Sequence, residues 1–283
     1  DVVPHATVAP VEGLRNALAA AGNRSAAVQL VLIDDDNAAA TIDGTRVSFA
    51  AALAEAARAD AVVIMAGTIS EEGADRATFA NANGTRLASP ASAGTGLDWY
   101  VEKPNLIGTT GPNNQVRNSH TMEMVRVILA ARSTTARDMP AKTVLVLKDN
   151  AGIAIDPVLL GRRGPAIVES WFPGQEDGDI VADVLFGKVN PSGKLPVTFP
   201  IAGKGFLDSV TAAQFPGVTD ANGHGQTVTY AEQLAIGYRW YDANRNGGCI
   251  AHAGRNPCVA FAFGHGLSYT SFKLGKPAHA PLG

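Results

Sequence analysis

Short, uninterrupted apolar runs separated by segments of helical periodicity constrain the fold of this chain more than any other feature. The clearest run, at 61–66, contains only alanine, valine, isoleucine and methionine. Runs of this length without polar alternation are typical of parallel strands that helices cover on both faces. We expect such strands at 28–33, 61–66, 143–147 and 166–168.

Apolar residues at helical spacing lie between these runs. We expect helices at 14–20, 49–58, 122–131 and 180–186. A strand–helix series of this kind predicts an α/β fold with a doubly wound, mostly parallel sheet and helices on both faces, an α/β sandwich. Ligands of such sheets bind beyond the carboxyl ends of the strands. The candidate binding loops are therefore those that follow Ile33, Ala66, Leu147 and Ser170.

The 283 residues are long enough to bury one large core, and we expect a single domain over 1–283. Its body of sheet and helices is expected at 1–200. An irregular closing segment is expected at 201–283, with an aromatic cluster at 238–242. Because the chain opens with Asp1 and not with Met, we also expect a processed product or a piece of a longer polypeptide.

Charge and hydropathy exclude several classes of partner. Lys and Arg number 23 against 26 Asp and Glu, a formal net charge of −3, and no block of like charge occurs. Proteins that bind nucleic acid or an anionic membrane surface normally carry a basic patch. The apolar run at 61–66 is also far shorter than the roughly 18 residues that span a bilayer. We therefore expect no nucleic acid and no membrane as partners.

The chain also lacks the motifs of common metal and cofactor sites. Its six histidines are scattered, and no two of them have the i, i+4 spacing of a zinc site on one helix face. There is no Gly-x-x-x-x-Gly-Lys-Ser/Thr phosphate loop and no Gly-x-Ser-x-Gly nucleophile motif. The three aspartates at 34–36 fit a solvated strand end better than a calcium or magnesium site. We predict no metal and no cofactor.

The two cysteines, Cys249 and Cys258, lie nine positions apart in a loop rich in glycine and asparagine. No further Cys or His follows at zinc spacing, so we favour a disulfide between them. Two reduced thiols in a flexible loop are the alternative. A disulfide predicts a secreted or periplasmic protein, because structural disulfides persist in oxidising compartments.

A long segment with little periodicity, 68–119, follows the predicted strand at 61–66. Loops of this length within a compact domain are usually functional or disordered. An acidic cluster with one arginine lies near its start and comprises Glu71, Glu72, Asp75 and Arg76. By composition alone the cluster is typical of a solvated turn. Its place at the ligand-binding edge of a parallel sheet favours a functional role.

Several long blocks in the second half of the chain resemble a known family. They lie at 171–178 (WFPGQEDG), 181–187 (VADVLFG), 190–200 (NPSGKLPVTFP), 237–242 (GYRWYD) and 263–270 (FGHGLSYT). In this order they closely resemble the C-terminal domain of glycoside hydrolase family 3, which includes β-glucosidases, glucan exohydrolases and β-xylosidases. By themselves the blocks are mostly scaffold, since they consist of turns, helix starts and aromatic packing residues.

The resemblance gives the acidic cluster a role. Family members carry a Glu-Gly-x-Asp-Arg motif after the second strand of this domain, and its Glu is the general acid/base. The matching residues here run from Glu72 to Arg76, so the resemblance implies that Glu72 is the acid/base. Glu71 is its near neighbour, and Asp75 and Arg76 would fix the loop through an ion pair or hydrogen bonds.

The implied reaction is the retaining hydrolysis of a β-glycosidic bond, which uses two carboxyl groups about 5–5.5 Å apart. In the family the nucleophilic Asp lies in an N-terminal (β/α) barrel, in a Ser-Asp-Trp type segment. This chain has no match to that segment, because its Asp98–Trp99 pair follows Leu97. The expected partners are therefore a barrel domain that carries the nucleophile and a β-linked oligosaccharide or glycoside substrate. The alternative is a non-catalytic carbohydrate-binding or interaction domain.

Two aromatic residues in the long segment, Trp99 and Tyr100, are candidate substrate-binding residues. The C–H faces of a sugar ring pack well on aromatic planes. Anchoring of the long segment to the domain explains the same two residues equally well, so both interpretations stay open.

Overall fold

The computed structural model describes residues 4–23, 25–34, 37–68, 96–97, 99–101, 116–118, 120–211, 213–215, 217–219, 221–222, 226–244, 247–252, 255–273 and 275–276. Of residues 99–101, 116–118 and 226 only the backbone is described.

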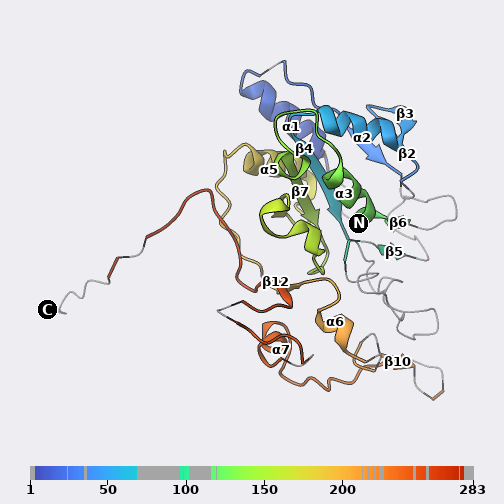
Figure 1. Ribbon diagram of the computed structural model, residues 1–283, viewed down its shortest axis with the longest axis vertical. Coiled ribbons are helices and arrows are strands. Elements are labelled where there is room, and N and C mark those ends of the chain that lie inside the picture. Colours follow the sequence, from blue (N-terminus) through green and yellow to red (C-terminus); the bar gives the residue numbers. More distant parts are fainter. Residues whose placement is uncertain are drawn as a thin grey trace.

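Within these ranges the chain alternates helices and short strands (Figure 1). The α-helices are α1 (Pro10–Ala20), α2 (Phe49–Arg58), α3 (Thr121–Ala130), α4 (Met139–Lys142), α5 (Asp177–Leu185), α6 (Phe206–Ser209) and α7 (Tyr238–Asp242). The strands are β1 (Val31–Ile33), β2 (Ala39–Ile42), β3 (Thr45–Ser48), β4 (Val62–Gly67), β5 (Trp99–Val101), β6 (Val116–Asn118), β7 (Thr143–Lys148), β8 (Ala166–Glu169), β9 (Phe199–Pro200), β10 (Val218–Thr219), β11 (Gln226–Thr227) and β12 (Val259–Phe261).

A three-stranded parallel sheet in the order β4-β7-β8 lies at the centre of the body. The main core forms around it from Ile64, Leu145 and Leu147 of the strands together with apolar residues of α3. In Figure 1, α3 and α5 lie on opposite sides of β4 and β7. The expected strands at 61–66, 143–147 and 166–168 are thus confirmed as neighbours in one parallel sheet, with ends that differ by one residue.

The helices follow their sequence signals. Helix α2 begins after Ser48, whose hydroxyl accepts a hydrogen bond from the Ala51 N–H at 3.2 Å and so caps an otherwise unpaired donor. Helix α5 has Asp177 and Asp179 in its first turn, where the helix dipole favours negative charge. Helix α1 packs along α5, and the Gly178 N–H donates to the Val8 carbonyl at 2.8 Å just before α1.

The expected parallel strand at 28–33 is wrong. Only Val31–Ile33 form a strand, β1, and it pairs antiparallel with β2, which continues into β3. Its Leu32 side chain is 58% exposed, which a strand buried on both faces would not allow. The molecule therefore combines a small parallel sheet with separate antiparallel sheets, and the doubly wound sheet is smaller than the sequence predicts.

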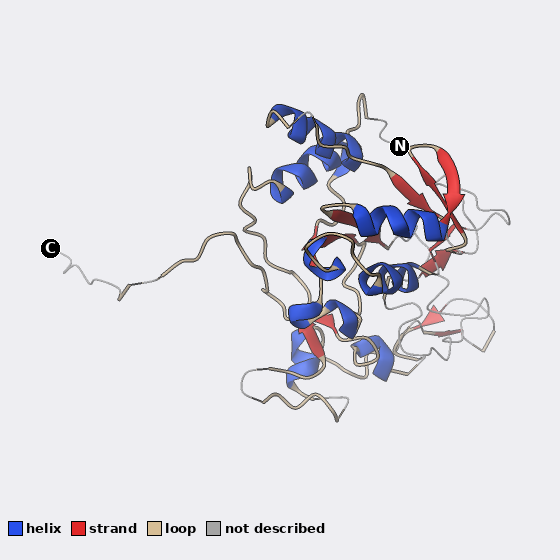
Figure 2. Cartoon of the chain, turned by 45° about the horizontal axis from the view of Figure 1, so that its top comes forward, coloured by secondary structure: helices blue, strands red, loops and turns tan. Residues whose placement is uncertain are grey.

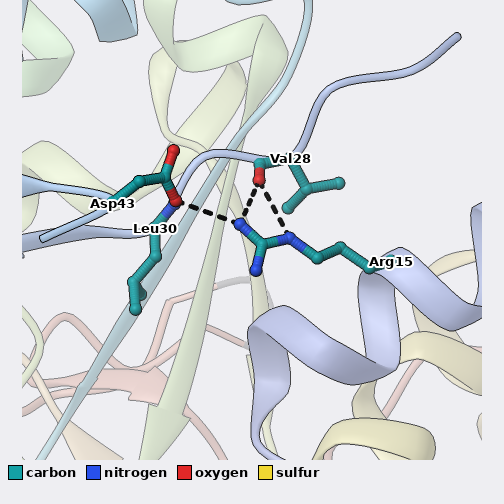
Figure 3. Close-up of polar contacts among 4 residues, drawn as sticks. All are labelled: Arg15, Val28, Leu30 and Asp43. Carbon is teal, nitrogen blue, oxygen red and sulfur yellow. Dashed lines mark hydrogen bonds and ion pairs between the residues drawn. The ribbon is translucent and has the colours of Figure 1, made fainter.

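The physical reason lies in the Asp43–Gly44 turn between β2 and β3. Both residues have positive φ angles, 45° and 85°, as the tight two-residue turns of β-hairpins require. The Asp43 carboxylate also accepts hydrogen bonds from the Leu30 N–H at 3.0 Å and from the Arg15 guanidinium at 3.0 Å (Figure 3). The same guanidinium donates to the Val28 carbonyl, so these contacts fix the chain before β1 against the hairpin and α1.

The closing segment is irregular, as expected, and its short elements form a second apolar cluster. Strand β12 pairs antiparallel with β9 and so ties this part to the body. The cluster comprises Trp240, Tyr241, Cys249 and Cys258, with Phe206 and Val259 against it. The aromatic motif at 237–242 is thus packing, at least for its two buried rings. Beyond β12 the last described residues extend away from the body in both views (Figures 1 and 2).

The long segment that follows β4 contains one described element pair. Strands β5 and β6 form an antiparallel ladder in which Trp99 pairs with Asn118 and Tyr100 with Arg117. The low periodicity of the sequence in this part did not predict these strands. In the part of the chain that the structure describes, no helix has both the length and the apolar composition that crossing a bilayer requires.

Candidate functional site

The carboxyl ends of β4, β7 and β8 meet at one edge of the parallel sheet, as parallel strands must. The register pairs Gly67 with Lys148 and Leu147 with Glu169. The polar residues that follow each strand are therefore neighbours in space. This is the edge at which the sequence predicts ligand binding, for the loops after Ala66, Leu147 and Ser170. The loop after Ile33 belongs to the antiparallel sheet instead.

The end of β4 is held tightly against the end of β7. A Cβ atom on Gly67 would lie 2.0 Å from the Lys148 carbonyl oxygen, so only glycine allows the two backbones to approach this closely. The Thr68 N–H donates to the same carbonyl at 3.1 Å. The Thr68 hydroxyl lies 3.0 Å from Asp149 Oδ1 and 2.9 Å from Asn150 Oδ1. We call these five residues, Gly67, Thr68, Lys148, Asp149 and Asn150, the β4 clamp.

Asp149 of this clamp lies next to a second carboxyl group, that of Glu169. Asp149 is only 1% exposed, and Glu169 lies beside it at the end of β8. Burial, together with the negative charge of Asp149, raises the pKa of Glu169 to about 8, although the Trp171 N–H donates to its Oε1 at 2.9 Å and acts in the opposite direction. At neutral pH Glu169 therefore holds its proton for most of the time.

The segment after β8 is bent sharply at this edge. Trp171 has a positive φ of 53°, which costs about 1 kcal/mol or more for a bulky residue and persists only where its surroundings enforce it. Its ring packs edge to face on Phe199 at 6.0 Å, and the Ser170 hydroxyl donates to the Leu147 carbonyl at 3.0 Å. These contacts hold the bend that turns the chain from β8 towards α5.

An ion pair joins the same edge to the next helix. Lys148, the last residue of β7, pairs with Asp177, the first residue of α5. Both side chains are about one-fifth exposed, and burial lowers the pKa of Lys148. The pair fixes the start of α5 relative to β7, next to the β4 clamp.

The residues predicted from the family motif, Glu71, Glu72, Asp75 and Arg76, lie outside the described residues. Trp99 and Tyr100 form part of β5, and the structure describes their backbone alone. Their roles as acid/base, supporting residues and sugar contacts therefore stay predictions.

The cysteines form a bond in the structure. The sulfur atoms of Cys249 and Cys258 are 2.03 Å apart, and both residues are 2% exposed within the second apolar cluster. The Asn256 side chain bridges them, because its amide donates to the Cys249 carbonyl at 2.9 Å and its oxygen accepts from the Cys258 N–H at 2.9 Å. Among the described residues, no group of three or more His, Cys, Asp and Glu is arranged to hold a metal ion.

Thr68, Asp149 and Glu169 are the residues at this edge that the sequence analysis did not single out. The sequence pattern pointed to the loops that contain Thr68 and Asp149 and to the loop just beyond Glu169, but not to these residues themselves. A signal was present, because Lys148-Asp149-Asn150 and Glu169-Ser170 place polar groups directly at the ends of two apolar runs. Polar residues at that position in a parallel strand project at the ligand-binding edge.

The raised pKa of Glu169 predicts a pH-dependent stability. In the unfolded chain this carboxyl loses its proton near pH 4.5, whereas in the folded chain it keeps the proton up to about pH 8. The folded state therefore binds more protons between these values, and stability falls as the pH rises through this window. Glu169→Gln cannot ionise, so its free energy of unfolding should fall by ~2 kcal/mol less between pH 5 and pH 8 than that of the wild type.

Urea unfolding at a series of pH values tests this prediction. Glu123→Gln, an exposed position on α3, is the matched control and should keep the pH dependence of the wild type. If the free energies of unfolding of Glu169→Gln and the wild type change with pH in the same way, Glu169 ionises normally in the folded chain.

A small parallel sheet with helices packed against it and buried acidic groups at its carboxyl edge defines this chain as an α/β domain. Residues 117–269, more than half of the chain, match the family described as "Glycosyl hydrolase family 3 C-terminal domain". The chain belongs to this family.

Several curated proteins are similar in sequence. Beta-glucosidase B of Emericella nidulans is 38% identical over 178 residues, which cover 62% of this chain and 18% of that protein. Beta-glucosidase BoGH3A of Bacteroides ovatus is 38% identical over 113 residues, which cover 40% of this chain and 13% of that protein. The chain thus spans less than a fifth of the curated relatives that it matches here.

Solved structures show the same fold. DesR, a beta-glucosidase from Streptomyces venezuelae in complex with D-glucose, aligns with a TM-score of 0.50 at 25% identity, over 79% of this chain and 20% of that one. Beta-glucosidase 3B from Thermotoga neapolitana in complex with glucose aligns with a TM-score of 0.55 at 24% identity, over 96% of this chain and 32% of that one. The chain is homologous to β-glucosidases of family 3, which are hydrolases.

Proposed function

We propose that this chain is the C-terminal α/β domain of a retaining β-glucosidase-like hydrolase and that it supplies Glu72 as the general acid/base. The observation that carries the proposal is the family match together with the Glu-Gly-x-Asp-Arg motif at 72–76. The curated relatives that share up to 38% identity with it are β-glucosidases. Terminal β-linked sugars of oligosaccharides or aryl glycosides are the proposed substrates.

The position of the motif along the chain supports this role. Thr68 lies at the carboxyl edge of the parallel sheet, and Glu72 follows four residues later. Four residues of extended chain span at most about 14 Å, and in this proposal Glu72 acts near the carboxyl edge of the sheet. In this proposal Glu71, Asp75 and Arg76 support the loop around it.

The proposed reaction divides the two carboxyl groups between two domains. An Asp of a separate (β/α) barrel attacks the anomeric carbon, while Glu72 gives its proton to the leaving oxygen. Glu72 then takes a proton from the water that hydrolyses the glycosyl-enzyme. A general acid must be protonated near neutral pH, and a barrel packed over Glu72 would provide the burial that raises its pKa. Trp99 and Tyr100 are proposed to contact the sugar.

We also propose a secreted or periplasmic protein. The support is the disulfide between Cys249 and Cys258, which is buried in the second apolar cluster. Structural disulfides of this kind persist in oxidising compartments and are rare in the cytosol.

An assay of the chain alone tests the division of the active site. We expect no hydrolysis of an aryl β-glucoside by residues 1–283, and turnover once the same chain is joined to its barrel domain, because one carboxyl group cannot complete a retaining reaction. Hydrolysis by the chain alone would contradict the proposal. Binding of oligosaccharide by the chain alone, without turnover in the joined protein, would support the non-catalytic carbohydrate-binding alternative.

A further inference from the structure

We propose that Thr68 is a positioning residue for the general acid and that the β4 clamp fixes the point at which the chain leaves the sheet towards Glu72. This inference rests on the proposed function. Thr68 is the last described residue before the segment that carries the catalytic motif, and its contacts lie at the carboxyl edge of the sheet.

The first observation is the density of contacts at one residue. Thr68 is 2% exposed, its N–H donates to the Lys148 carbonyl, and its hydroxyl lies within 3.0 Å of both Asp149 Oδ1 and Asn150 Oδ1. A single hydroxyl supplies one hydrogen, and here two oxygen acceptors of the neighbouring strand end compete for it. A residue that merely ends a strand needs none of these side-chain contacts.

The second observation is the close approach of the backbones of β4 and β7 immediately before Thr68. Gly67 is the last residue of β4, and a Cβ there would overlap the Lys148 carbonyl at 2.0 Å. The backbone of β4 is thus pressed against β7 up to its final residue. The contacts of Thr68 with the end of β7 therefore fix the last described residue before the segment that carries Glu72.

The third observation concerns the surroundings of Asp149, which accepts a hydrogen bond from the Thr68 hydroxyl. Asp149 is 1% exposed and lies beside Glu169, which burial and the negative charge of Asp149 keep protonated at neutral pH. Glu169 of β8 therefore lies close enough to Asp149 for the two carboxyl groups to interact electrostatically. The acceptor of the Thr68 hydroxyl is thus buried next to a residue of β8, so that all three parallel strands place a polar residue at this edge.

The catalytic consequence follows from distance along the chain. Glu72 follows Thr68 by four residues in the sequence, and in this proposal a shift of the Thr68 backbone is passed on to the general acid. A displacement of about 1 Å of a catalytic group can cost ~100-fold in rate. Removal of the Thr68 hydroxyl should therefore impair proton donation to the leaving group before it impairs any other step.

Leaving-group dependence in the enzyme that includes the barrel domain tests this inference. Phenyl β-D-glucoside needs a proton from the general acid, whereas 2,4-dinitrophenyl β-D-glucoside has a leaving group that departs without one. For Thr68→Val we expect kcat/KM to fall ~20-fold on the phenyl glucoside and less than ~3-fold on the dinitrophenyl glucoside. Thr68→Ser, which keeps the hydroxyl, should restore most of the loss.

A matched control lies at the opposite edge of the same sheet. Thr143 begins β7, is also 2% exposed, and donates its hydroxyl to the Met139 carbonyl at 2.7 Å. Thr143→Val removes an equally buried hydroxyl, and its effect should be equal on the two substrates. Asn150→Ala provides a second test at an exposed residue that should not disturb folding. It should show the same leaving-group dependence as Thr68→Val, at ~5-fold.

The outcomes separate the two proposals. One outcome overturns the positioning role alone: Glu72→Gln shows leaving-group dependence, but Thr68→Val either lowers kcat/KM equally on the two substrates or lowers it on neither. In that case the proposed function stands. If Glu72→Gln shows no such dependence, the proposed function fails, and the positioning role that rests on it fails as well.

Discussion

Replacement of Glu72 by glutamine is expected to lower kcat/KM on unactivated β-glucosides by about 1,000-fold in the enzyme that includes the barrel domain. Glutamine keeps the size of the side chain but has no proton to give to the leaving oxygen, and general acid/base catalysis contributes ~10²–10⁴-fold to such reactions. The loss should be much smaller on a dinitrophenyl glycoside. Steady-state kinetics on both substrates, for purified and folded variants, measure the effect.

Chemical rescue gives an independent measure of the same role. Azide attacks a glycosyl-enzyme without the help of a general base, so it should accelerate Glu72→Gln on an activated aryl glycoside and yield the β-glycosyl azide. Glu71→Gln is the matched control, one position away in the same loop, and is expected to stay within ~3-fold of the wild type. Full turnover of an unactivated glucoside by Glu72→Gln would refute the assignment.

Replacement of Lys142 by methionine is expected to destabilise the folded chain by about 3 kcal/mol. Lys142 is 4% exposed, and its ammonium group donates to the Ala57 carbonyl at 2.8 Å and the Ala59 carbonyl at 2.7 Å, at the end of α2. Methionine keeps the apolar stem and removes both charge-assisted bonds; the Ala57 carbonyl keeps the Thr134 N–H as a donor at 3.0 Å, whereas the Ala59 carbonyl loses the Lys142 ammonium group. It also removes a positive charge from the end of the helix dipole.

Thermal unfolding checks this prediction, since a loss of this size in a domain of this length lowers the Tm by about 6–12 °C. Lys188→Met is the control, because the Lys188 side chain is 75% exposed and forms an ion pair with Asp183 at the surface. Such pairs contribute ~0–1 kcal/mol, so its Tm should change little. Equal Tm values for the two variants would mean that the buried ammonium of Lys142 contributes nothing beyond its stem.

The Lys142 contact also illustrates a limit of local sequence signals. A lysine is normally exposed, and neither its neighbours nor its spacing marks Lys142 as buried. It is buried because α4 and the start of β7 pack against the end of α2, 83 to 85 residues earlier in the chain. Only folding brings the ammonium group to those carbonyls.

Local patterns in the sequence were nevertheless sufficient to predict much of the fold. Continuous apolar runs predicted three neighbouring strands of the parallel sheet, because strands covered on both faces need no polar residues. Helical spacing predicted α2 at 49–58, the range that the structure has. The resemblance of the blocks between 171 and 270 also agrees with the family to which the chain belongs.

The sequence by itself determined the three strands of the parallel sheet, the main helices, the family and the candidate acid/base, because periodicity and motifs depend on residues that are close together in the chain. Only the tertiary structure decided how strands pair and which polar groups share an edge. Strand β1 joined an antiparallel hairpin because the Asp43 carboxylate reaches back to Leu30 and Arg15. Thr68, Asp149 and Glu169 meet because three parallel strands end together, a proximity between residues 20 to 101 positions apart that no local pattern encodes.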